Sequence, residues 1–155
     1  MAEAAEILAL LRQRGMTLAT AESCTGGMLG SLFTEVPGSS AVYHGGVISY
    51  CNDLKHRLLG VPQALLDRFG AVSAEVAESM AAGARVVGAA SVGIGITGLA
   101  GPESDESGLP VGLVYIGYSD RDHTCHRRIH AAGDRQAVRI AACDAALELL
   151  LEKLT

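Results

Sequence analysis

The sequence predicts a single α/β domain over residues 1–155, a three-layer α/β/α sandwich with a mixed, mainly parallel central sheet. Short apolar runs alternate with segments of helical periodicity along the chain, which is the pattern of this fold class. The length of 155 residues suits one domain with its own core. Apolar residues make up 49% of the chain and Trp is absent, so we expect a core of small and aliphatic side chains.

The N-terminal half alternates between helical and extended patterns. Residues 3–14 place Ile7 and several leucines on one side of a helix that ends at Gly15. The elements expected next are a strand over 16–21, a polar glycine turn over 23–27, a helix through about 34, a break over 37–40, a strand over 47–50, and helices over 52–59 and 62–69. Glycine, proline or polar residues separate most of these elements, as is typical of their ends.

Two capping residues organise the C-terminal half. We expect Ser73 and Asp134 to be N-caps, because their side-chain oxygens can accept from the free N–H groups of a helix. The expected elements are a helix over 74–87, a strand over 91–97, a glycine loop over 98–102, an exposed loop over 103–108, strands over 111–118 and 124–130, and a long C-terminal helix after Asp134. The two adjacent late strands imply an antiparallel or mixed portion of the sheet.

Charge and cysteine usage exclude several classes of protein. The net charge of -5 argues against a nucleic-acid partner, which would require a basic surface. The four cysteines form no C-x-x-C pair, so neither a disulfide framework nor a zinc ribbon is expected. The N-terminus lacks the pattern of a signal peptide, and no apolar run is long enough for a membrane span. We therefore expect a cytoplasmic protein with no membrane partner.

The first polar turn places two hydroxyls and a thiol where a strand leads into a helix. Free backbone N–H groups at such a place can hold an anion or a developing oxyanion. The residues alone leave two interpretations open: Ser23 or Thr25 is an ordinary N-cap, or Ser23 is a nucleophile, with Cys24 as a rival. Lys55 lies one turn into the helix over 52–59, where a lysine is normally solvated; only a desolvated lysine acts as a base near neutral pH.

Later motifs suggest anion binding. Thr97 and Gly98 begin a loop after an apolar strand, but the G-x-G-x-x-G fingerprint of dinucleotide-binding oxidoreductases is absent. Arg135 lies at the start of the last helix, where an arginine together with the helix N-terminus can bind a phosphate; an exposed salt bridge is the alternative. Four potential metal ligands lie close together in the sequence: His123, Cys125, His126 and His130. They alternate between the two faces of a strand, so no metal site is expected.

Six motifs in register resemble the CinA C-terminal family. They are Glu22–Gly27, Gly38–Ser40, Tyr50–Asn52 with Lys55, Thr97–Pro102, Pro110–Gly112 and Gly133–Arg135. The resemblance extends over about residues 5–150 and implies a three-layer α/β/α fold that commonly self-associates, here as a homodimer. It also implies hydrolysis of the carboxamide of nicotinamide mononucleotide to nicotinate mononucleotide and ammonia, with no metal or redox cofactor.

The resemblance assigns roles to individual residues. It implies Ser23 as nucleophile and Lys55 as its base, in a serine–lysine variant of the nucleophile–base pair. Backbone N–H groups of Thr25, Gly26 and Gly27 are expected to stabilise the oxyanion. The remaining expected substrate contacts are Tyr50 at the pyridinium ring or the amide, Asn52 at the reacting groups, and Arg135 with Thr97 and Gly98 at the phosphate. A non-catalytic module that senses a pyridine nucleotide is the alternative function.

Overall fold

An open five-stranded sheet forms the middle layer of the computed structural model, which describes residues 2–155. Its strands are β1 (Leu18–Glu22), β2 (Tyr43–Ile48), β3 (Val92–Gly98), β4 (Leu113–Ser119) and β5 (Thr124–His130). In space they follow the order β2-β1-β3-β4-β5. β1 pairs in parallel with β2 and β3, whereas β4 pairs antiparallel with β3 and β5. The carboxyl ends of β1, β2 and β3 therefore lie at one edge of the sheet, where α/β proteins commonly bind ligands.

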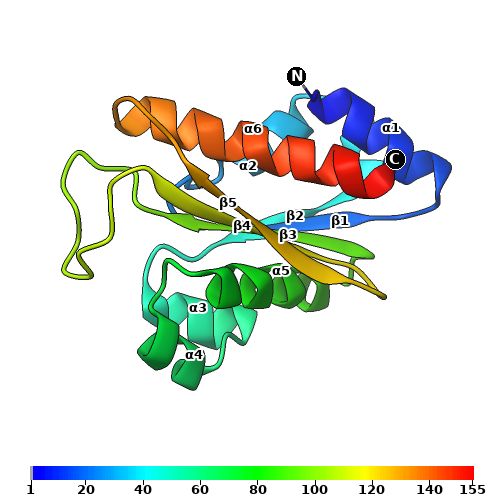
Figure 1. Cartoon of the computed structure of the whole chain (residues 1–155). Helices are drawn as coiled ribbons and strands as arrows, with labels where there is room; N and C mark the ends of the chain where they lie inside the picture. Colours follow the sequence, from blue (N-terminus) through cyan, green and yellow to red (C-terminus); the bar gives the residue numbers. More distant parts are fainter. Residues whose placement is uncertain (1) are drawn as a thin grey trace.

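Helices cover both faces of the sheet, which confirms the predicted three-layer fold (Figure 1). One layer consists of α1 (Ala4–Gln13), α2 (Met28–Thr34) and α6 (Arg135–Leu154); the other consists of α3 (Asn52–Leu59), α4 (Gln63–Phe69) and α5 (Ala74–Gly88). A short 3₁₀ turn, η1 (Ser39–Ala41), precedes β2. Consecutive strand residues point to opposite faces, so Leu18 joins the core under α1 and α6, whereas Ala19 and Ala21 join the core under α5.

Helix α5 lies close to the sheet because glycines face it. A Cβ added to Gly93, Gly95 or Gly117 would overlap backbone atoms of α5. This close approach fixes the distance between α5 and strands β3 and β4, and it leaves no room for larger side chains on that face. The glycine-rich composition of the strands therefore has a packing reason.

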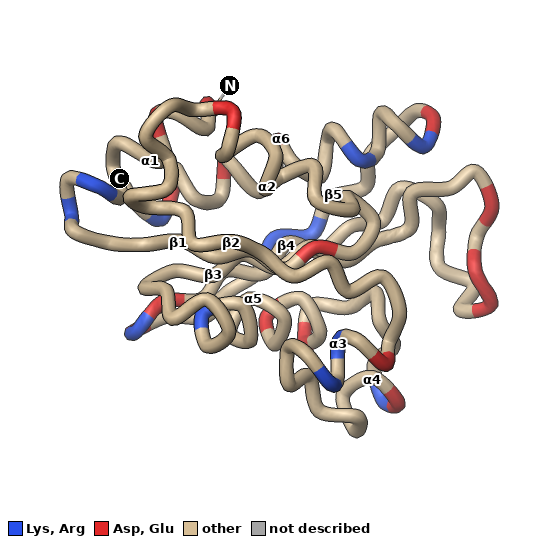
Figure 2. The backbone as a smooth tube through the Cα atoms, turned by 180° about the vertical axis from the view of Figure 1, so that it is seen from behind, with Lys and Arg blue, Asp and Glu red and all other residues tan. Residues whose placement is uncertain are grey.

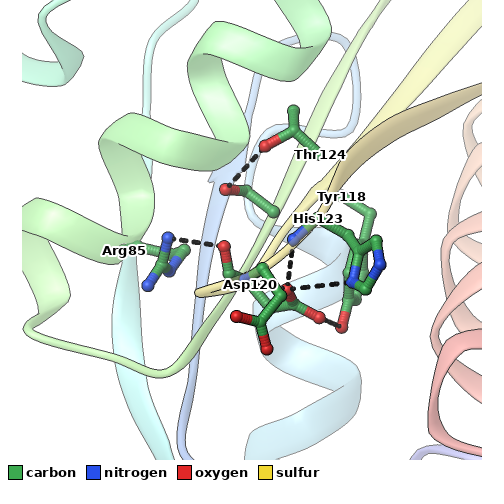
Figure 3. Close-up of polar contacts among 7 residues, drawn as sticks. Arg85, Tyr118, Asp120, His123 and Thr124 are labelled. Carbon is green, nitrogen blue, oxygen red and sulfur yellow. Dashed lines mark hydrogen bonds and ion pairs between the residues drawn. The ribbon is translucent and has the colours of Figure 1, made fainter.

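The turn between β4 and β5 is anchored to the C-terminal end of α5 (Figure 3). The Asp120 carboxylate accepts from the Tyr118 hydroxyl at 2.6 Å and from the backbone N–H of His123 at 2.7 Å. The backbone carbonyl of Asp120 accepts from Arg85 of α5 at 2.8 Å. These contacts fix the hairpin at the end of the sheet opposite to the carboxyl ends of β1 and β3.

The structure confirms most expected elements and corrects one strand. Ser73 accepts from the N–H of Val76 at 3.2 Å, and Asp134 accepts from that of Ala137 at 2.9 Å, so both N-caps are confirmed. The strand expected over residues 47–50 is wrong in its bounds, because β2 covers Tyr43–Ile48. Two glycines interrupt the apolar pattern there, and only the pairing with β1 shows that they belong to the strand.

Candidate active site

The end of β1 brings two polar segments together. The N–H of Ser23 donates to the carbonyl of Ile96 in β3 at 3.0 Å, which holds the serine at the carboxyl end of the sheet. One residue earlier, the carbonyl of Glu22 accepts from the N–H of Ser49 at 2.8 Å. The segment that leads from β2 into α3 consequently passes directly beside Ser23.

Lys55 is buried against this serine. Its side chain is on the fourth residue of α3 and is only 2% exposed. The Nζ atom donates to the carbonyl of Ser49 at 2.8 Å and to Oγ of Ser23 at 3.3 Å. No ion pair within residues 2–155 involves Lys55. An amine without a carboxylate partner in such a place is poorly stabilised as an ammonium ion.

Burial sets the protonation states around the serine. It lowers the pKa of Lys55 from the usual range of an amine, although the nearby thiols of Cys51 and Cys24 act in the opposite direction. Burial also raises the pKa of Cys24 to about 11. Because the thiolate is the reactive form of cysteine, Cys24 is poorly suited to be the nucleophile. The amine is therefore shifted toward its basic form, and the thiol is kept in its inert form.

Ser23 and Lys55 open into a cleft of about 420 Å³. The predicted site residues that line it are Ser23, Tyr50, Asn52, Lys55, Thr97 and Gly98. The turn before α5, residues 70–72, and part of the acidic loop, residues 105–107, also contribute to its wall. Two other clefts have similar volumes, about 430 and 440 Å³, but neither is lined by a serine beside a buried lysine. The chemistry of the lining, rather than size, marks this cleft as the candidate site.

Tyr50 lines the cleft, whereas Arg135 lies outside the lining and contacts Tyr50. Arg135, the first residue of α6, donates to the hydroxyl of Tyr50 at 2.9 Å and to the carbonyl of Gly101 at 2.6 Å. Tyr50 is 63% exposed and lies beyond the end of β2. Thr97 is buried, and its hydroxyl donates to the carbonyl of Ala71 at 2.8 Å. Its oxygen therefore remains available only as an acceptor.

The turn after Ser23 differs in part from its prediction. Thr25 is fully buried, and neither it nor Gly26 or Gly27 lines the cleft. The N–H of Gly26 donates to the carbonyl of Ser23 at 3.1 Å, and that of Gly27 donates to the Glu22 carboxylate at 3.2 Å. Both glycine N–H groups are therefore occupied within the protein. The N–H of Thr25 donates to no acceptor within residues 2–155.

Glu22 performs the capping that sequence patterns assign to Ser23 or Thr25. Its carboxylate is 2% exposed and accepts from the N–H of Gly27, and from those of Leu29 and Gly30 at 3.0 Å each. An anion at a helix N-terminus is stabilised by the helix dipole. The hydroxyl of Ser23 is consequently not used as a cap for α2. Glu22 is six positions before the first residue of α2, which is outside the usual capping spacing, so sequence analysis missed this role.

Arg139 is a second residue that sequence analysis missed. It lies one turn after Arg135 in α6 and donates to the carbonyls of Cys24 and Thr25. The available signal was the spacing of four residues, which places Arg135 and Arg139 on one face of the helix. The loop over 103–108 was expected only to be exposed, and no role at the site was predicted for it. Part of it lines the cleft, and Figure 2 shows the acidic positions in this loop between β3 and β4.

The histidines of the C-terminal half bind protein groups. His126 of β5 contacts the Glu78 carboxylate at 2.6 Å, and His130 contacts the carbonyl of Val111 at 3.1 Å. Among residues 2–155, no three His, Cys, Asp or Glu side chains form a group able to hold a metal ion. Nor does any helix in the described part of the chain combine the length and apolar character needed to cross a bilayer.

Fold and site together define an α/β/α sandwich protein with a buried serine–lysine pair at the carboxyl ends of its parallel strands. The chain belongs to the CinA C-terminal domain family, whose sequence model matches residues 2–154. A CinA-like protein of Geobacter sulfurreducens is 46% identical over 145 residues, which are 94% of this chain and 35% of that relative. The chain thus spans about a third of the length of such curated relatives.

Solved structures of similar length have the same fold. A CinA superfamily protein from Klebsiella pneumoniae superimposes with a TM-score of 0.94 at 34% identity, covering 97% of this chain and 94% of the other. A competence/damage inducible protein from Agrobacterium tumefaciens gives a TM-score of 0.91 at 38% identity, covering 96% of this chain and 92% of the other. The family predicted from the six motifs is thereby confirmed.

Proposed function

We propose that this domain hydrolyses the carboxamide of nicotinamide mononucleotide to nicotinate mononucleotide and ammonia. The observation that carries the proposal is the hydrogen bond of 3.3 Å between Ser23 Oγ and the buried Nζ of Lys55. A hydroxyl becomes a useful nucleophile when a neighbouring base can accept its proton. The lowered pKa of Lys55 supports that role, because it increases the neutral fraction of the amine at moderate pH.

The proposed reaction has two stages. Lys55 accepts the proton of Ser23 while Oγ forms a bond to the carboxamide carbon, and the carbonyl oxygen becomes an oxyanion. Lys55 then returns the proton to the amide nitrogen, the C–N bond breaks, ammonia leaves, and an ester to Ser23 remains. Water attacks this ester with Lys55 as base, and cleavage of the ester bond restores the Ser23 hydroxyl and releases nicotinate mononucleotide.

The charges of the cleft suit a substrate with opposite charges at its two ends. Asp105 and Glu106 contribute to the wall, and their carboxylates favour a cationic pyridinium ring. Arg135, which contacts the lining residue Tyr50, lies at the N-terminus of α6, where a phosphate is favoured. We therefore assign the phosphate to Arg135 near the loop that begins at Thr97 and Gly98, and we assign Tyr50 and Asn52 to the ring and carboxamide. The Thr97 hydroxyl already donates to Ala71, so it is not assigned as a donor to the phosphate.

Ammonia release tests the proposal. The purified chain is incubated with nicotinamide mononucleotide, with and without a chelator, and ammonia and nicotinate mononucleotide are quantified. We expect equal amounts of the two products, no effect of the chelator, and loss of activity in Ser23→Ala. The matched controls are Ser31→Ala, at an exposed serine of α2, and Lys153→Met, at the other lysine of the chain; both should behave as wild type.

Two outcomes would favour another function. Binding of nicotinamide mononucleotide without product formation would favour the non-catalytic sensor. Wild-type activity in Ser23→Ala would assign the chemistry to another group.

The phosphate assignment is tested with Arg135→Ala. This variant should raise KM more than it lowers kcat, because binding that is equal in the ground and transition states affects KM. An unchanged KM would refute that assignment.

Self-association is a separate proposal. We propose that the chain forms a homodimer in solution, as the family resemblance implies. Exposed apolar side chains such as Val86 and Val87 at the end of α5, 81% and 54% exposed, are consistent with a surface that a second copy could cover. Light scattering gives the molar mass directly, and a monomer mass at assay concentrations would refute the proposal.

A further inference from the structure

Ser23 and Thr97 are neighbours across the pairing of β1 with β3. The last pair of the parallel register is Glu22 with Ile96. The N–H of Ser23 donates to the carbonyl of Ile96 at 3.0 Å, which is the next hydrogen bond of the same parallel ladder. The ladder therefore places Ser23 beside Thr97. Neighbouring strands lie about 4.8 Å apart, so roughly one strand spacing separates the two residues.

Both side chains lie on the face of the sheet that α5 covers. Successive strand residues alternate between the two faces. Ala21, two residues before Ser23, belongs to the core under α5, and Gly95, two residues before Thr97, faces the backbone of α5. The Thr97 hydroxyl accordingly donates to the carbonyl of Ala71, in the turn before α5. Ser23, Thr97 and Ala71 all line the cleft, so the two hydroxyl-bearing residues share one site.

Ser23 has chemically different groups on its two sides. β1 lies between β2 and β3 in the sheet. Lys55 is in α3, which follows β2, and its Nζ donates to Ser23 Oγ at 3.3 Å, so the base comes from the β2 side. Thr97 belongs to β3, on the opposite side of Ser23. A carbon bonded to Ser23 Oγ consequently lies near both an amine and a hydroxyl oxygen.

The Thr97 hydroxyl is an acceptor toward anything bound in the cleft. A hydroxyl has one proton and two lone pairs. Its proton is committed to the Ala71 carbonyl at 2.8 Å, and a carbonyl does not donate in return. In the part of the chain that the structure describes, no group donates to the Thr97 oxygen. Thr97 is 1% exposed, yet it lines the cleft, as does Lys55 at 2%. Its lone pairs are therefore available to a substrate N–H.

A carboxamide satisfies an acceptor of this kind, whereas the product of its hydrolysis does not. The amide NH₂ group has two N–H donors. The oxyanion and the product carboxylate have only acceptor oxygens, so neither gains a hydrogen bond from Thr97. When Lys55 returns its proton to the amide nitrogen, the nitrogen becomes cationic and its N–H groups become stronger donors. The contact with Thr97 is therefore strongest as the C–N bond breaks.

We propose that the Thr97 oxygen accepts a hydrogen bond from the amide nitrogen of the substrate and thereby favours a carboxamide over a carboxylate beside Ser23. The inference rests on the proposed function. Thr97 gains and loses no proton: Lys55 supplies the proton to nitrogen, the C–N bond breaks, and ammonia leaves from its contact with Thr97. Because the contact strengthens in the transition state, its loss lowers kcat more than it raises KM.

The first test compares an amide with an ester in Thr97→Val, which replaces the hydroxyl by a methyl group of similar size. We expect kcat for ammonia release from nicotinamide mononucleotide to fall by about tenfold to hundredfold, because a hydrogen bond to a group that becomes charged is lost. Hydrolysis of the methyl ester of nicotinate mononucleotide should change less than about twofold, since the ester has no N–H to donate. Thr97→Ser should retain most of the amide activity, because it keeps the hydroxyl.

The matched control is Thr20→Val. Thr20 of β1 is also 1% exposed, and its hydroxyl bonds to that of Tyr43 at 2.7 Å, outside the lining of the cleft. This variant should hydrolyse the amide and the ester at wild-type rates. Equal losses on the two substrates in Thr97→Val, or an unchanged amide rate, would overturn the inference. If Thr97→Val does not fold, Thr97→Ala removes the same oxygen and is judged by the same ratio of amide to ester rates.

A second test measures binding without turnover. In Ser23→Ala, calorimetry gives the Kd of nicotinamide mononucleotide and the Kd of nicotinate mononucleotide. Adding Thr97→Val should weaken binding of the amide and not that of the carboxylate. The ratio of the two Kd values should therefore move by about threefold to tenfold in favour of the carboxylate. The same ratio in Ser23→Ala with Thr20→Val should not change.

The two tests separate the role of Thr97 from the proposed function. Protein that binds nicotinamide mononucleotide but releases no ammonia refutes the proposed function, and the ratio of Kd values still decides the role of Thr97. Ammonia release by wild type with an unchanged Kd ratio in the Thr97→Val variant overturns the role of Thr97 alone. A protein that binds neither nucleotide overturns both hypotheses.

Discussion

The lowered pKa of Lys55 predicts how both the reaction rate and the stability of the fold depend on pH. Burial lowers its pKa below the usual value of about 10.4, so the folded protein releases this proton at a lower pH than the unfolded chain. Between the two pKa values, the unfolded chain binds one more proton. The free energy of unfolding should therefore rise with pH by about 1.4 kcal/mol per unit in this window, and this dependence should stop near pH 10.4.

The same pKa governs the rate. Below it, the neutral fraction of Lys55 falls tenfold per pH unit, so kcat/KM should fall about tenfold per unit and level off above it. Lys55→Met should lose about 10²- to 10⁴-fold in kcat, the usual contribution of a general base. The pH dependence of kcat/KM and the pH dependence of the unfolding free energy must give the same pKa, because both report Lys55 in the free enzyme.

The assays are ammonia release and urea unfolding, each at half-unit pH steps. The informative quantity is the difference in unfolding free energy between wild type and Lys55→Met. This difference removes the contributions of Cys24 and Cys143, whose pKa values burial raises to about 11 and about 12. Those thiols make stability fall above about pH 9, because only the unfolded chain ionises there. A stability difference that does not change with pH, or a rate that levels off only near pH 10.4, would refute the reasoning.

Three further predictions follow from burial and packing. Iodoacetamide should modify exposed Cys51 much faster than Cys24, whose thiol is buried with a pKa raised to about 11; equal rates in peptide mass spectra would contradict this. Gly117→Ala should destabilise the fold by about 1–3 kcal/mol, because a Cβ would overlap the carbonyl of Ala77 in α5, and an unchanged melting temperature would argue against this packing. Ser73→Ala should lower the unfolding free energy by about 1 kcal/mol through loss of the α5 N-cap, seen as a lower urea midpoint at constant slope.

Local patterns predicted the elements because each element's pattern lies within a few residues. Ser73 and Asp134 could be assigned as caps, since a cap depends on a hydroxyl or carboxylate three residues before its partner N–H. The three-layer fold followed from the alternation of strands and helices. The least accurate boundary was that of β2, where Gly45 and Gly46 belong to the strand only through pairing with β1.

Motif order alone also determined the family and the candidate pair of Ser23 and Lys55. Their contact, however, depends on the sheet order, which places the ends of β1 and β2 side by side. Ser23 and Lys55 are 32 positions apart in the sequence. With a different strand order they would not meet, and they would be an ordinary capping hydroxyl and a solvated lysine.

Only the tertiary structure decided which groups at the site are free. Glu22 occupies the N–H groups of α2, and Arg139 reaches the Ser23 turn across 115 residues of sequence to the carbonyl of Cys24. Burial of Lys55, and with it the direction of its pKa shift, likewise depends on segments distant along the chain. Sequence patterns describe the spacing of residues within one element. Desolvation and the occupancy of hydrogen-bonding groups depend on residues that the tertiary fold brings into contact from distant parts of the chain, so they cannot be predicted from local patterns.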